Sequence, residues 1–418
     1  MLNNPSQNFS TIEKREPVNT WINDEATLED IQVIPDGDQV AALFVGDDSK
    51  SHLCVNGTVW THSFNRVWYP RFTPKNSLTA LAQDDDGWTL IVDDSPWDTR
   101  FDYAWDTRFN DNGNHIALKY QVQGEYGMAV DGMSWDTGYS GIAQGVLSQD
   151  GLKSAAVVQL KAISEGDIFT FQEGIFTAAI NGNAWKRAFV NVWDPCFSRD
   201  GNHLAASVRL NLYDYSVAVD GILWPDTFDC VWNPCFHPEN QDVVAPVRAK
   251  QAWTMAKNGE IFWKNRFFQV WHPQFNQDGS YLAAIVAPKF GTWSIAVNDK
   301  IWKLDGFDAI ANMTFSPDGS RIAAIAIKKG KQTLVYDGKA CDRYCERIWP
   351  PVFSHDSRHI AAKIQIKDRY TVILNGRVWD KHYDRVWDPV FDPRDKTLII
   401  RVMDNGVYLK HRVPLSMV

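Results

Sequence analysis

The 418-residue chain has few cysteines, no long apolar run and no excess of positive charge. Its six cysteines are scattered, which is not the pattern of a disulfide framework and favours free thiols in a reducing cytoplasm. No window approaches the run of about eighteen apolar residues that a membrane-spanning helix needs, and the N-terminus lacks the apolar core of a signal peptide. We therefore expect a cytoplasmic protein with no segment inserted into a membrane.

The formal net charge of -9 argues against a nucleic-acid partner, because affinity for a phosphate backbone comes from concentrated Lys and Arg. The close thiol pairs, Cys230 with Cys235 and Cys341 with Cys345, do not have the spacing of common zinc or iron–sulfur sites. A G-x-S-x-G nucleophile elbow is also missing. We expect no metal, no cofactor, no catalytic residue and no enzymatic activity, although a triad assembled in space from distant residues stays open.

Tryptophan is abundant, with 19 residues, and nearly all of them fall on a repeat. The copy at 185–201 reads W-K-R-A-F-V-N-V-W-D-P-C-F-S-R-D-G, with a first tryptophan, a middle aromatic four residues on and a second tryptophan eight residues on. The first tryptophan recurs at Trp60, Trp97, Trp135, Trp185, Trp224, Trp263, Trp302 and Trp379, with Ala340 in its place in one copy. The second tryptophan recurs at Trp68, Trp105, Trp193, Trp232, Trp271, Trp349 and Trp387. Most copies are spaced about 39 residues apart.

Each repeat holds four short apolar or alternating runs separated by turn residues. Asp-Gly and Asn-Gly pairs supply the positive φ angles that tight β-hairpins need. A unit of this length with four antiparallel strands is typical of a propeller blade. The sequence therefore predicts an all-β fold, a β-propeller of about ten four-stranded antiparallel blades.

The last repeat runs out after three strands, and residues 17–22 (P-V-N-T-W-I) read as an isolated outer strand with Trp21 at the first-tryptophan position. We expect the N-terminal strand to complete the last blade and to remove the exposed edge there. The expected organisation is an N-terminal extension at 1–16 and a single propeller domain at 17–418. Two five-bladed propellers are the alternative.

Two stretches, F-S-P-D-G-S-R-I-A-A-I at 315–325 and F-S-R-D-G-N-H-L-A-A-S at 197–207, resemble the WD40-like repeat of TolB-type propellers. The whole chain, with its W-x3-F-x2-V-W-x-P-x-F repeats, is similar to the tryptophan-rich TmcD-type subunit of the transmembrane redox complex of sulfate-reducing bacteria. That resemblance implies a cofactor-free accessory subunit at the cytoplasmic face of the membrane. It implies an iron–sulfur protein, a membrane cytochrome b and, on the far side, a multihaem cytochrome as the other subunits.

A tryptophan repeated once per blade is first of all a packing residue between blades, and an exposed aromatic binding rim is the functional alternative. The repeat breaks in two places. Residues 135–185 carry an insertion and have Ala143 and Gly145 where other copies have Trp and Pro. Residues 302–340 lose the second tryptophan and contain a basic loop. Insertions in repeat proteins tend to lie on a working face. The candidate partner-docking residues are Ile163, Glu165, Asp167, Phe169, Phe171, Lys328, Lys329 and Lys331.

The sequence thus favours a non-catalytic scaffold subunit of a membrane-associated electron-transfer complex, peripheral to the inner face of the cell membrane. The alternative is a propeller enzyme or ligand-binding protein with a site at the central channel. The two differ in whether polar residues converge at the ends of the inner strands, and in this sequence those positions vary from repeat to repeat.

Overall fold

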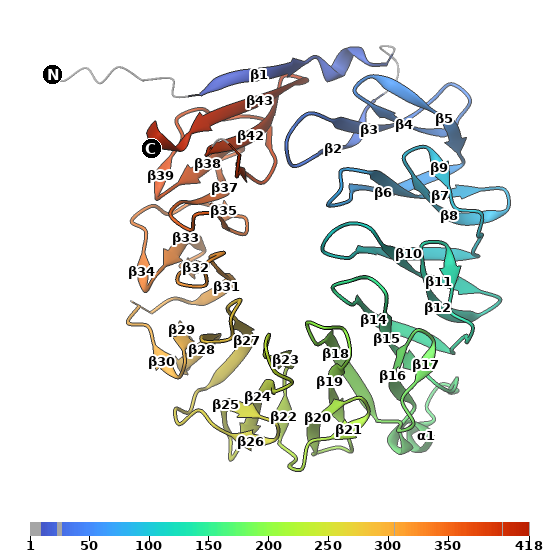
Figure 1. Cartoon of the computed structure of the whole chain (residues 1–418), viewed down its shortest axis with the longest axis vertical. Coiled ribbons are helices and arrows are strands. Elements are labelled where there is room, and N and C mark those ends of the chain that lie inside the picture. The colour runs from blue at the N-terminus through green and yellow to red at the C-terminus, as the bar shows by residue number, and fades with distance from the viewer. Residues whose placement is uncertain (1–9, 23–26, 305, 395, 418) are drawn as a thin grey trace. The chain divides into compact units, whose positions relative to one another are not determined.

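The fold is described from a computed structural model, in which residues 10–22, 27–304, 306–394 and 396–417 are placed. These residues form ten antiparallel sheets; in nine of them the strands follow one another in the chain, and the tenth combines the last strands of the chain with its first one (Figure 1). The predicted fold class is confirmed: the chain is an all-β propeller of ten four-stranded blades, and in blades 6, 9 and 10 the first strand is divided into two short segments that pair with the same second strand. None of the helices in the described residues has the length and apolarity needed to cross a membrane.

The ten blades divide between two compact units, which are described separately. Unit 1 comprises residues 1–63 and 303–418, and unit 2 comprises residues 64–302. With blades numbered in chain order, unit 1 holds blades 1, 8, 9 and 10, and unit 2 holds blades 2 to 7. The division is four and six, so it does not support the alternative of two five-bladed propellers.

The blades of unit 2 are as follows. Blade 2 has β6 (Arg66–Phe72), β7 (Leu78–Asp84), β8 (Gly87–Val92) and β9 (Ser95–Pro96). Blade 3 has β10 (Tyr103–Phe109), β11 (Ile116–Val122), β12 (Glu125–Val130) and β13 (Met133–Ser134). Blade 4 has β14 (Gly141–Leu147), β15 (Ser154–Gln159), β16 (Phe176–Ile180) and β17 (Asn183–Ala184), with α1 (Ile168–Glu173) between β15 and β16. Blade 5 has β18 (Asn191–Phe197), β19 (Leu204–Arg209), β20 (Tyr215–Val219) and β21 (Ile222–Leu223). Blade 6 has β22 (Cys230–Val231), β23 (Cys235–Phe236), β24 (Val243–Ala249), β25 (Ala252–Lys257) and β26 (Glu260–Ile261). Blade 7 has β27 (Gln269–Phe275), β28 (Leu282–Lys289), β29 (Thr292–Val297) and β30 (Lys300–Ile301).

The blades of unit 1 follow the same plan. Blade 1 has β2 (Glu29–Val33), β3 (Val40–Val45), β4 (Ser51–Val55) and β5 (Thr58–Phe64). Blade 8 has β31 (Ala309–Phe315), β32 (Ile322–Lys328), β33 (Lys331–Tyr336) and β34 (Lys339–Ala340). Blade 9 has β35 (Arg347–Ile348), β36 (Val352–Phe353), β37 (Ile360–Ile366), β38 (Arg369–Leu374) and β39 (Arg377–Val378). Blade 10 has β40 (Arg385–Val386), β41 (Val390–Asp392), β42 (Thr397–Asp404), β43 (Val407–Pro414) and β1 (Thr11–Glu16). Two short 3-10 helices, η1 (Val18–Thr20) and η2 (Leu415–Met417), complete the elements.

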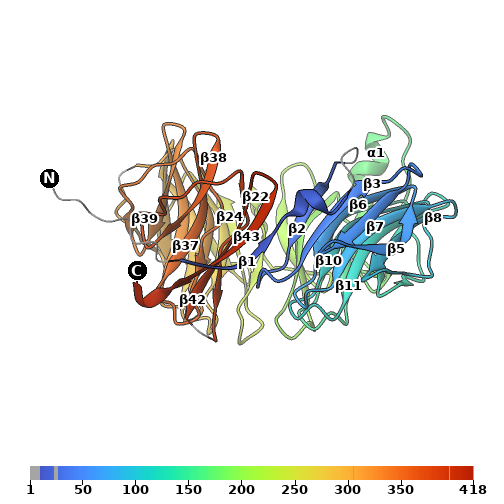
Figure 2. The ribbon, with the colours of Figure 1, turned by 90° about the horizontal axis from the view of Figure 1, so that it is seen from above.

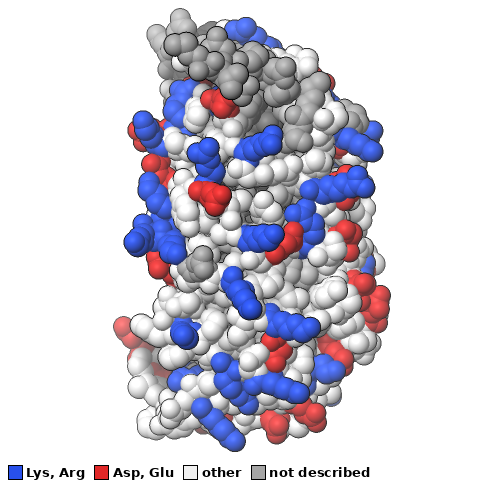
Figure 3. All heavy atoms as spheres, turned by 90° about the vertical axis from the view of Figure 1, so that its left-hand side faces the viewer, with Lys and Arg blue, Asp and Glu red and all other residues white. Residues whose placement is uncertain are grey.

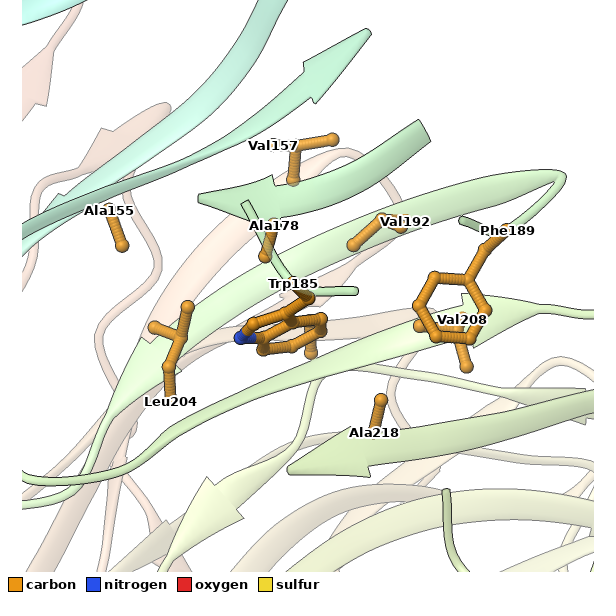
Figure 4. Close-up of a cluster of buried hydrophobic side chains, with 10 residues drawn as sticks. Ala155, Val157, Ala178, Trp185, Phe189, Val192, Leu204, Val208 and Ala218 are labelled. Atoms are coloured by element: carbon orange, nitrogen blue, oxygen red, sulfur yellow. The ribbon is translucent and has the colours of Figure 1, made fainter. Parts of the chain in front are cut away.

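The first tryptophan of each repeat joins two blades, as its recurrence predicts. Trp185 follows β17 and is 9% exposed. Its ring packs on Ala155 and Ala178 of blade 4 and on Leu204 and other side chains of blade 5 (Figure 4). The small alanines in the second and third strands leave the space that the indole fills. Burial of a Trp side chain removes about 150–250 Å² from water, so this contact is a main source of cohesion between blades.

The Asn-Gly or Asp-Gly turn between the third and fourth strands has two separate tasks. Its Asn or Asp, in the left-handed conformation, accepts the backbone N–H that begins the second strand of the same blade; Asp220, for example, accepts from Leu204 at 2.9 Å. The same hydrogen bond occurs in blades 1 to 9, with acceptors Asn56, Asp93, Asp131, Asn181, Asp220, Asn258, Asn298, Asp337 and Asn375. In blades 2 and 7 the acceptor is followed by Asp94 or Asp299 in place of glycine. In blade 5 the glycine lies against the first tryptophan of the preceding blade: a methyl group on Gly221 would come within 3.2 Å of Trp185 Cβ. The turn therefore fixes both its own blade and the contact with the previous one.

The repeat break at Ala143 and Gly145 has a packing explanation. Lys119 of blade 3 is only 7% exposed and forms a 2.8 Å ion pair with Asp106. A methyl group on Gly145 would meet Lys119 Cε at 3.1 Å. Blade 4 thus lacks the usual proline where the Lys119 side chain needs space.

Blade 10 is completed by the N-terminal strand, as predicted, but by a strand that lies earlier than residues 17–22. β1 (Thr11–Glu16) pairs antiparallel with β43, and Glu16 lies opposite Tyr408. Residues 17–22 contain η1 instead, because Pro17 lacks the N–H that a paired strand donates. Trp21 still occupies the first-tryptophan position, since a methyl group on Gly57 of blade 1 would lie 3.2 Å from its Cδ1.

The closing contact between blades 10 and 1 uses charge and hydrogen bonds. Lys410 Nζ, in a side chain 5% exposed, forms ion pairs with Glu13 of β1 at 3.3 Å and with Asp38 of blade 1 at 2.7 Å. Arg401, also 5% exposed, donates to the carbonyl oxygens of Val33 and Ile34 at 3.0 and 2.7 Å. A buried charge needs such partners, so these contacts tie the two ends of the chain into one specific pairing.

The glycine of the turn should be needed for the neighbouring tryptophan and not only for its positive φ. Gly221 and Gly124 have φ of 80° and 83°, but nothing lies within 4 Å of a methyl group on Gly124. Gly124→Ala should lose only the roughly 1–2 kcal/mol of left-handed strain. Gly221→Ala should lose more, because Trp185 has to shift, and its urea unfolding midpoint should be the lower of the two. Equal midpoints would contradict the second task of this glycine.

Burial of His411 should make the protein sensitive to acid. His411 is 1% exposed, its Nε2 lies 3.2 Å from Tyr383 Oη, and burial, with a smaller effect of the Lys381 charge, lowers its pKa to about 4. The unfolded chain then binds a proton that the folded chain does not between pH 6.5 and pH 4. Stability should fall by about 3 kcal/mol as pH decreases through this range. In urea titrations His411→Gln should remove this part of the pH dependence, whereas His355→Gln, at an exposed position, should leave it unchanged.

Candidate protein-docking surface

The predicted insertion forms a separate small element between β15 and β16 of blade 4. It contains α1, and the segment projects beyond the ends of neighbouring strands of unit 2 (Figure 2). Leu160 N donates to Ile175 O at 2.8 Å and closes its base, while Ile175 is 1% exposed. Gly174, with φ of 95°, lies so close to the backbone of Phe189 that a methyl group would come within 2.9 Å. The insertion is therefore fixed at its base.

The five candidate residues in the insertion have different roles. Asp167 is the N-cap of α1: its carboxylate accepts from Thr170 N at 3.0 Å, and hydrogen bonds with Thr170 lower its pKa. Phe171 packs edge-on against Phe176, whose side chain borders the core around Trp185. These two residues hold the helix in place. Glu165, Ile163 and Phe169 are exposed, and Phe169 is 83% exposed.

Further large apolar side chains are exposed at the same ends of the strands, and sequence reasoning did not identify them. Ile168 in α1 is 61% exposed, Leu212 and Tyr213 in the β19–β20 turn are 56% and 79% exposed, and Phe290 in the β28–β29 turn is 86% exposed. Phe268, which precedes β27, is 62% exposed and lies 6.2 Å from the Phe290 ring. All of these segments join a second strand to a third, or an outer strand to the next blade, so strand direction places them at one edge of unit 2. We call Ile163, Ile168, Phe169, Leu212, Tyr213, Phe268 and Phe290 the loop-tip surface.

The β19–β20 turn is held in shape although its apolar side chains face outward. Arg209 donates to the carbonyl oxygens of Asn211 and Leu212, and Asn211 Oδ1 accepts from the N–H groups of Tyr213 and Asp214 at 2.9 and 3.0 Å. Ordered turns that display Leu and Tyr lose little conformational entropy when a partner covers them. The sequence feature that could have identified this turn is Tyr213, an aromatic residue between the second and third strands, where most other repeats have Gly, Asp or Lys.

The three candidate lysines lie in unit 1, on the hairpin between β32 and β33, and are not part of the loop-tip surface. Lys328 Nζ lies 5.6 Å from the centre of the Phe307 ring, and Lys331 pairs with Glu346 at 3.5 Å. Lys329 N donates to Asp308 Oδ2 at 2.6 Å. The structure therefore gives Lys328 a partner just before blade 8 and Lys331 a partner at the start of blade 9.

These lysines belong to a basic part of the chain. Residues 303–418 contain twenty Lys and Arg against fourteen Asp and Glu. Figure 3 shows Lys and Arg gathered on the side of the molecule where the outer strands β34 and β39 lie, which carry the exposed Lys339 and Arg377. Residues 1–302 contain 22 Lys and Arg against 37 Asp and Glu, so the net negative charge of the protein lies in that part of the chain.

The tryptophans separate into two groups by exposure. First tryptophans in blades 3 to 6 are buried, at 8%, 9%, 7% and 3% exposure for Trp135, Trp185, Trp224 and Trp263. Second tryptophans lie in or beside the first strand and pack on an aromatic ring of the third strand, either stacked, as Trp271 is on Trp293 at 4.5 Å, or edge-on, as Trp349 is to Tyr370 at 5.8 Å. Trp68 and Trp232 are the most exposed of this group, at 41% and 37%. The buried first tryptophans therefore pack between blades. The second tryptophans include partly exposed rings that could form an aromatic binding surface.

The described residues offer little support for a metal site, a reactive thiol or a catalytic pocket. They contain no group of three His, Cys, Asp or Glu placed to hold a metal ion. Burial raises the pKa of Cys54 and of Cys235 to about 11, so these thiols stay protonated at neutral pH. A hollow of about 370 Å³ between blades 5 and 6 is lined by Trp224 and by the polar side chains of His203, Asp220, Gln241 and Asn258. Asp220 and Asn258 accept the N–H groups that begin the second strands of their blades, and His203 Nδ1 lies 2.6 Å from Asp220 Oδ2.

The roles assigned to Asp167 and Glu165 can be tested by hydrogen exchange. Asp167→Ala removes the N-cap, which typically costs about 1 kcal/mol. The amide protons of Thr170 and Phe171 should then exchange about fivefold faster, since the helix opens more often. Glu165→Ala removes a neighbouring exposed carboxylate and should leave these rates unchanged. Equal effects of the two substitutions would contradict the capping role.

Comparison with known proteins identifies no family. No family model matches the sequence, and no curated protein matches it. A crystal structure of a eukaryotic initiation factor is similar at TM-score 0.49 and 11% identity, covering 81% of this chain and 99% of that one. The β-propeller domain of Cps50 (Swd1) from Myceliophteria thermophila is similar at TM-score 0.30 and 11% identity, covering 66% and 98%. The Dos1 propeller is similar at TM-score 0.39 and 9% identity, covering 74% and 92%.

Proposed function

We propose that the protein is a non-catalytic scaffold that binds other proteins through the loop-tip surface. The observation that carries this proposal is the exposure of several large apolar side chains at one edge of unit 2, from Phe169 at 83% to Tyr213 at 79% and Phe290 at 86%. Monomeric proteins rarely expose such residues together, and clustered aromatic residues are typical of protein interfaces.

The way these residues are held supports binding. The α1 segment is fixed at its base by Ile175 and Gly174, and the β19–β20 turn is fixed by Arg209 and Asn211. Side chains that are already in place give up less entropy on binding, so more of the buried apolar area contributes to affinity. The insertion would add contact area that the other blades lack.

We further propose that the partners are subunits of a membrane-associated electron-transfer complex. The support is the resemblance of the tryptophan repeat to the TmcD-type subunit of the redox complex of sulfate-reducing bacteria. The scaffold would lie at the cytoplasmic face of the membrane and contact an iron–sulfur protein or a membrane cytochrome b, with a multihaem cytochrome on the far side. It would carry no cofactor and bind no nucleic acid.

Co-purification tests the proposal in two steps. The tagged protein should bring down haem and iron–sulfur absorbance from solubilised membranes of its native cells. Phe169→Asp with Tyr213→Asp should reduce the recovered absorbance at least tenfold, because two apolar contacts are replaced by charges. Met133→Asp is the control, since Met133 is 78% exposed on the outer strand β13 and not at a loop tip.

The outcomes separate the two parts of the proposal. If the protein purifies with partners that contain no haem or iron–sulfur cluster, and Phe169→Asp releases them, the docking surface stands and the redox complex is wrong. If Met133→Asp releases the partners as strongly as Phe169→Asp, the loop-tip surface is not the docking site.

A further inference from the structure

Two of the second tryptophans, Trp349 and Trp387, have cationic side chains over their rings. In blade 9, Trp349 has the Arg347 guanidinium 4.9 Å from its ring centre and the Lys363 ammonium at 4.1 Å. In blade 10, the Arg385 guanidinium lies 5.6 Å from the ring centre of Trp387. Each of these rings therefore binds at least one cation supplied by its own blade, in the geometry of a cation–π contact.

Trp68 occupies the same repeat position in blade 2, but no Lys or Arg within the described residues lies over its ring. Arg66 stands at the repeat position of Arg347 and Arg385, yet the structure gives no contact of Arg66 with Trp68. Trp68 is 41% exposed and packs at 4.6 Å on Trp88, which is 3% exposed. Trp88 thus supports Trp68 on the side of the protein interior, and the rest of the Trp68 ring is exposed to solvent.

A second ring makes this position a corner. Tyr103 of blade 3 is 42% exposed, and its ring lies 6.5 Å from that of Trp68 at an interplanar angle of 77°. Tyr103 also stacks on Trp105 at 5.6 Å and lies edge-on to Trp88 at 5.8 Å, and these contacts fix its orientation. Two nearly perpendicular aromatic walls can contact one cation from two sides.

The part of the chain that forms this corner is acidic. Asp102 precedes Tyr103 and is exposed; its Oδ2 accepts from Gln123 N at 2.6 Å, which leaves its other oxygen as an acceptor. Asp85, also exposed, accepts a hydrogen bond from Asn65 at 2.9 Å. Residues 64–140 contain twelve Asp and Glu against six Lys and Arg. The tryptophans that carry their own cations lie instead in the basic stretch 303–418. The open corner thus lies where negative charge would attract a cation from outside.

We propose that the corner of Trp68 and Tyr103, with Asp102 and Asp85 beside it, binds an arginine side chain of a partner protein. A guanidinium fits better than an ammonium because it can stack on an indole and also donate hydrogen bonds to a carboxylate. The site lies in blades 2 and 3, whereas the loop-tip surface lies in blades 4, 5 and 7, so this inference does not depend on the proposed docking function.

Trp232 is a natural comparison within the same unit. It is 37% exposed, at the same repeat position, and stacks on Trp253 at 5.4 Å. The next blade has Gln269 where Tyr103 stands, so the second wall is missing. Arg248, exposed and paired in register with both Cys230 and Trp253, makes its surroundings less acidic. Trp232 should not bind an arginine side chain.

Fluorescence anisotropy with a labelled Arg-Gly repeat peptide tests the site at low salt. The full-length protein should bind this peptide in a saturable manner and bind the matching Gln-Gly peptide much more weakly. Trp68→Leu and Asp102→Asn should each weaken the binding by about five- to tenfold, as expected from one cation–π contact or one charge-assisted hydrogen bond. Trp232→Leu should leave it unchanged, and Arg66→Ala should leave it unchanged or tighten it by removing a competing cation.

Several results would overturn the proposal. These are the absence of saturable binding, equal weakening by Trp232→Leu and Trp68→Leu, or equal affinity for Arg and Gln peptides. Asp102 Oδ2 accepts from Gln123 N, and the amide oxygen of Asn can still accept that hydrogen bond, so a loss of binding in Asp102→Asn reports the lost charge. Phe169→Asp should bind the peptide normally, so failure of the loop-tip docking would leave this result unaffected.

Discussion

Cohesion between the blades depends on the Asn-Gly or Asp-Gly turn together with the first tryptophan. The polar residue of the turn holds the start of the second strand in its own blade, and the glycine gives the space for the tryptophan of the blade before it. A hydrogen bond inside one blade is thereby coupled to apolar packing between two. The coupling is mainly steric, because the Trp185 indole Nε1 is buried without a hydrogen-bond partner, whereas that of Trp135 donates to Ser154 at 2.8 Å.

The two ends of the chain meet under a different constraint. Blade 10 takes its outer strand from the N-terminus, so it has no hairpin to carry the turn. Its pairing with blade 1 relies instead on buried cations, with Lys410 and Arg401 held by Glu13, Asp38 and backbone carbonyl groups. The tryptophan contacts are alike in most blades and so do not distinguish one pair of blades from another, whereas an ion pair forms only where both charged partners are present. The charge contacts therefore favour this one pairing of strands over others.

Much of the fold was predictable because it depends on local spacing. The recurrence of tryptophan and of Asp-Gly or Asn-Gly predicted the number of strands per blade, the number of blades and the interblade role of Trp185. The closing strand was misplaced to residues 17–22 because Trp21 suggested a strand there, whereas η1 follows Pro17 and the pairing lies in Thr11–Glu16. The docking candidates were found only where the repeat length changed or the second tryptophan was lost. The turns that hold Tyr213 and Phe290 differ in length, but both lie in repeats with the usual spacing, so spacing gave no signal. The cation over Trp349 depends on side-chain geometry that a linear pattern does not contain.

The composition of blade 10 also sets the order in which the chain can finish folding during synthesis. β1 is made before the other strands of the ten blades and its partner β43 after them, so β1 stays without its partner until all the other strands have been made. The inner blades, whose strands are consecutive, can form as soon as each is made. A chain that stops before β43 would keep an open strand edge and lack the site for Glu13. Pairing of β1 with β43 therefore takes place only after all ten blades have been made.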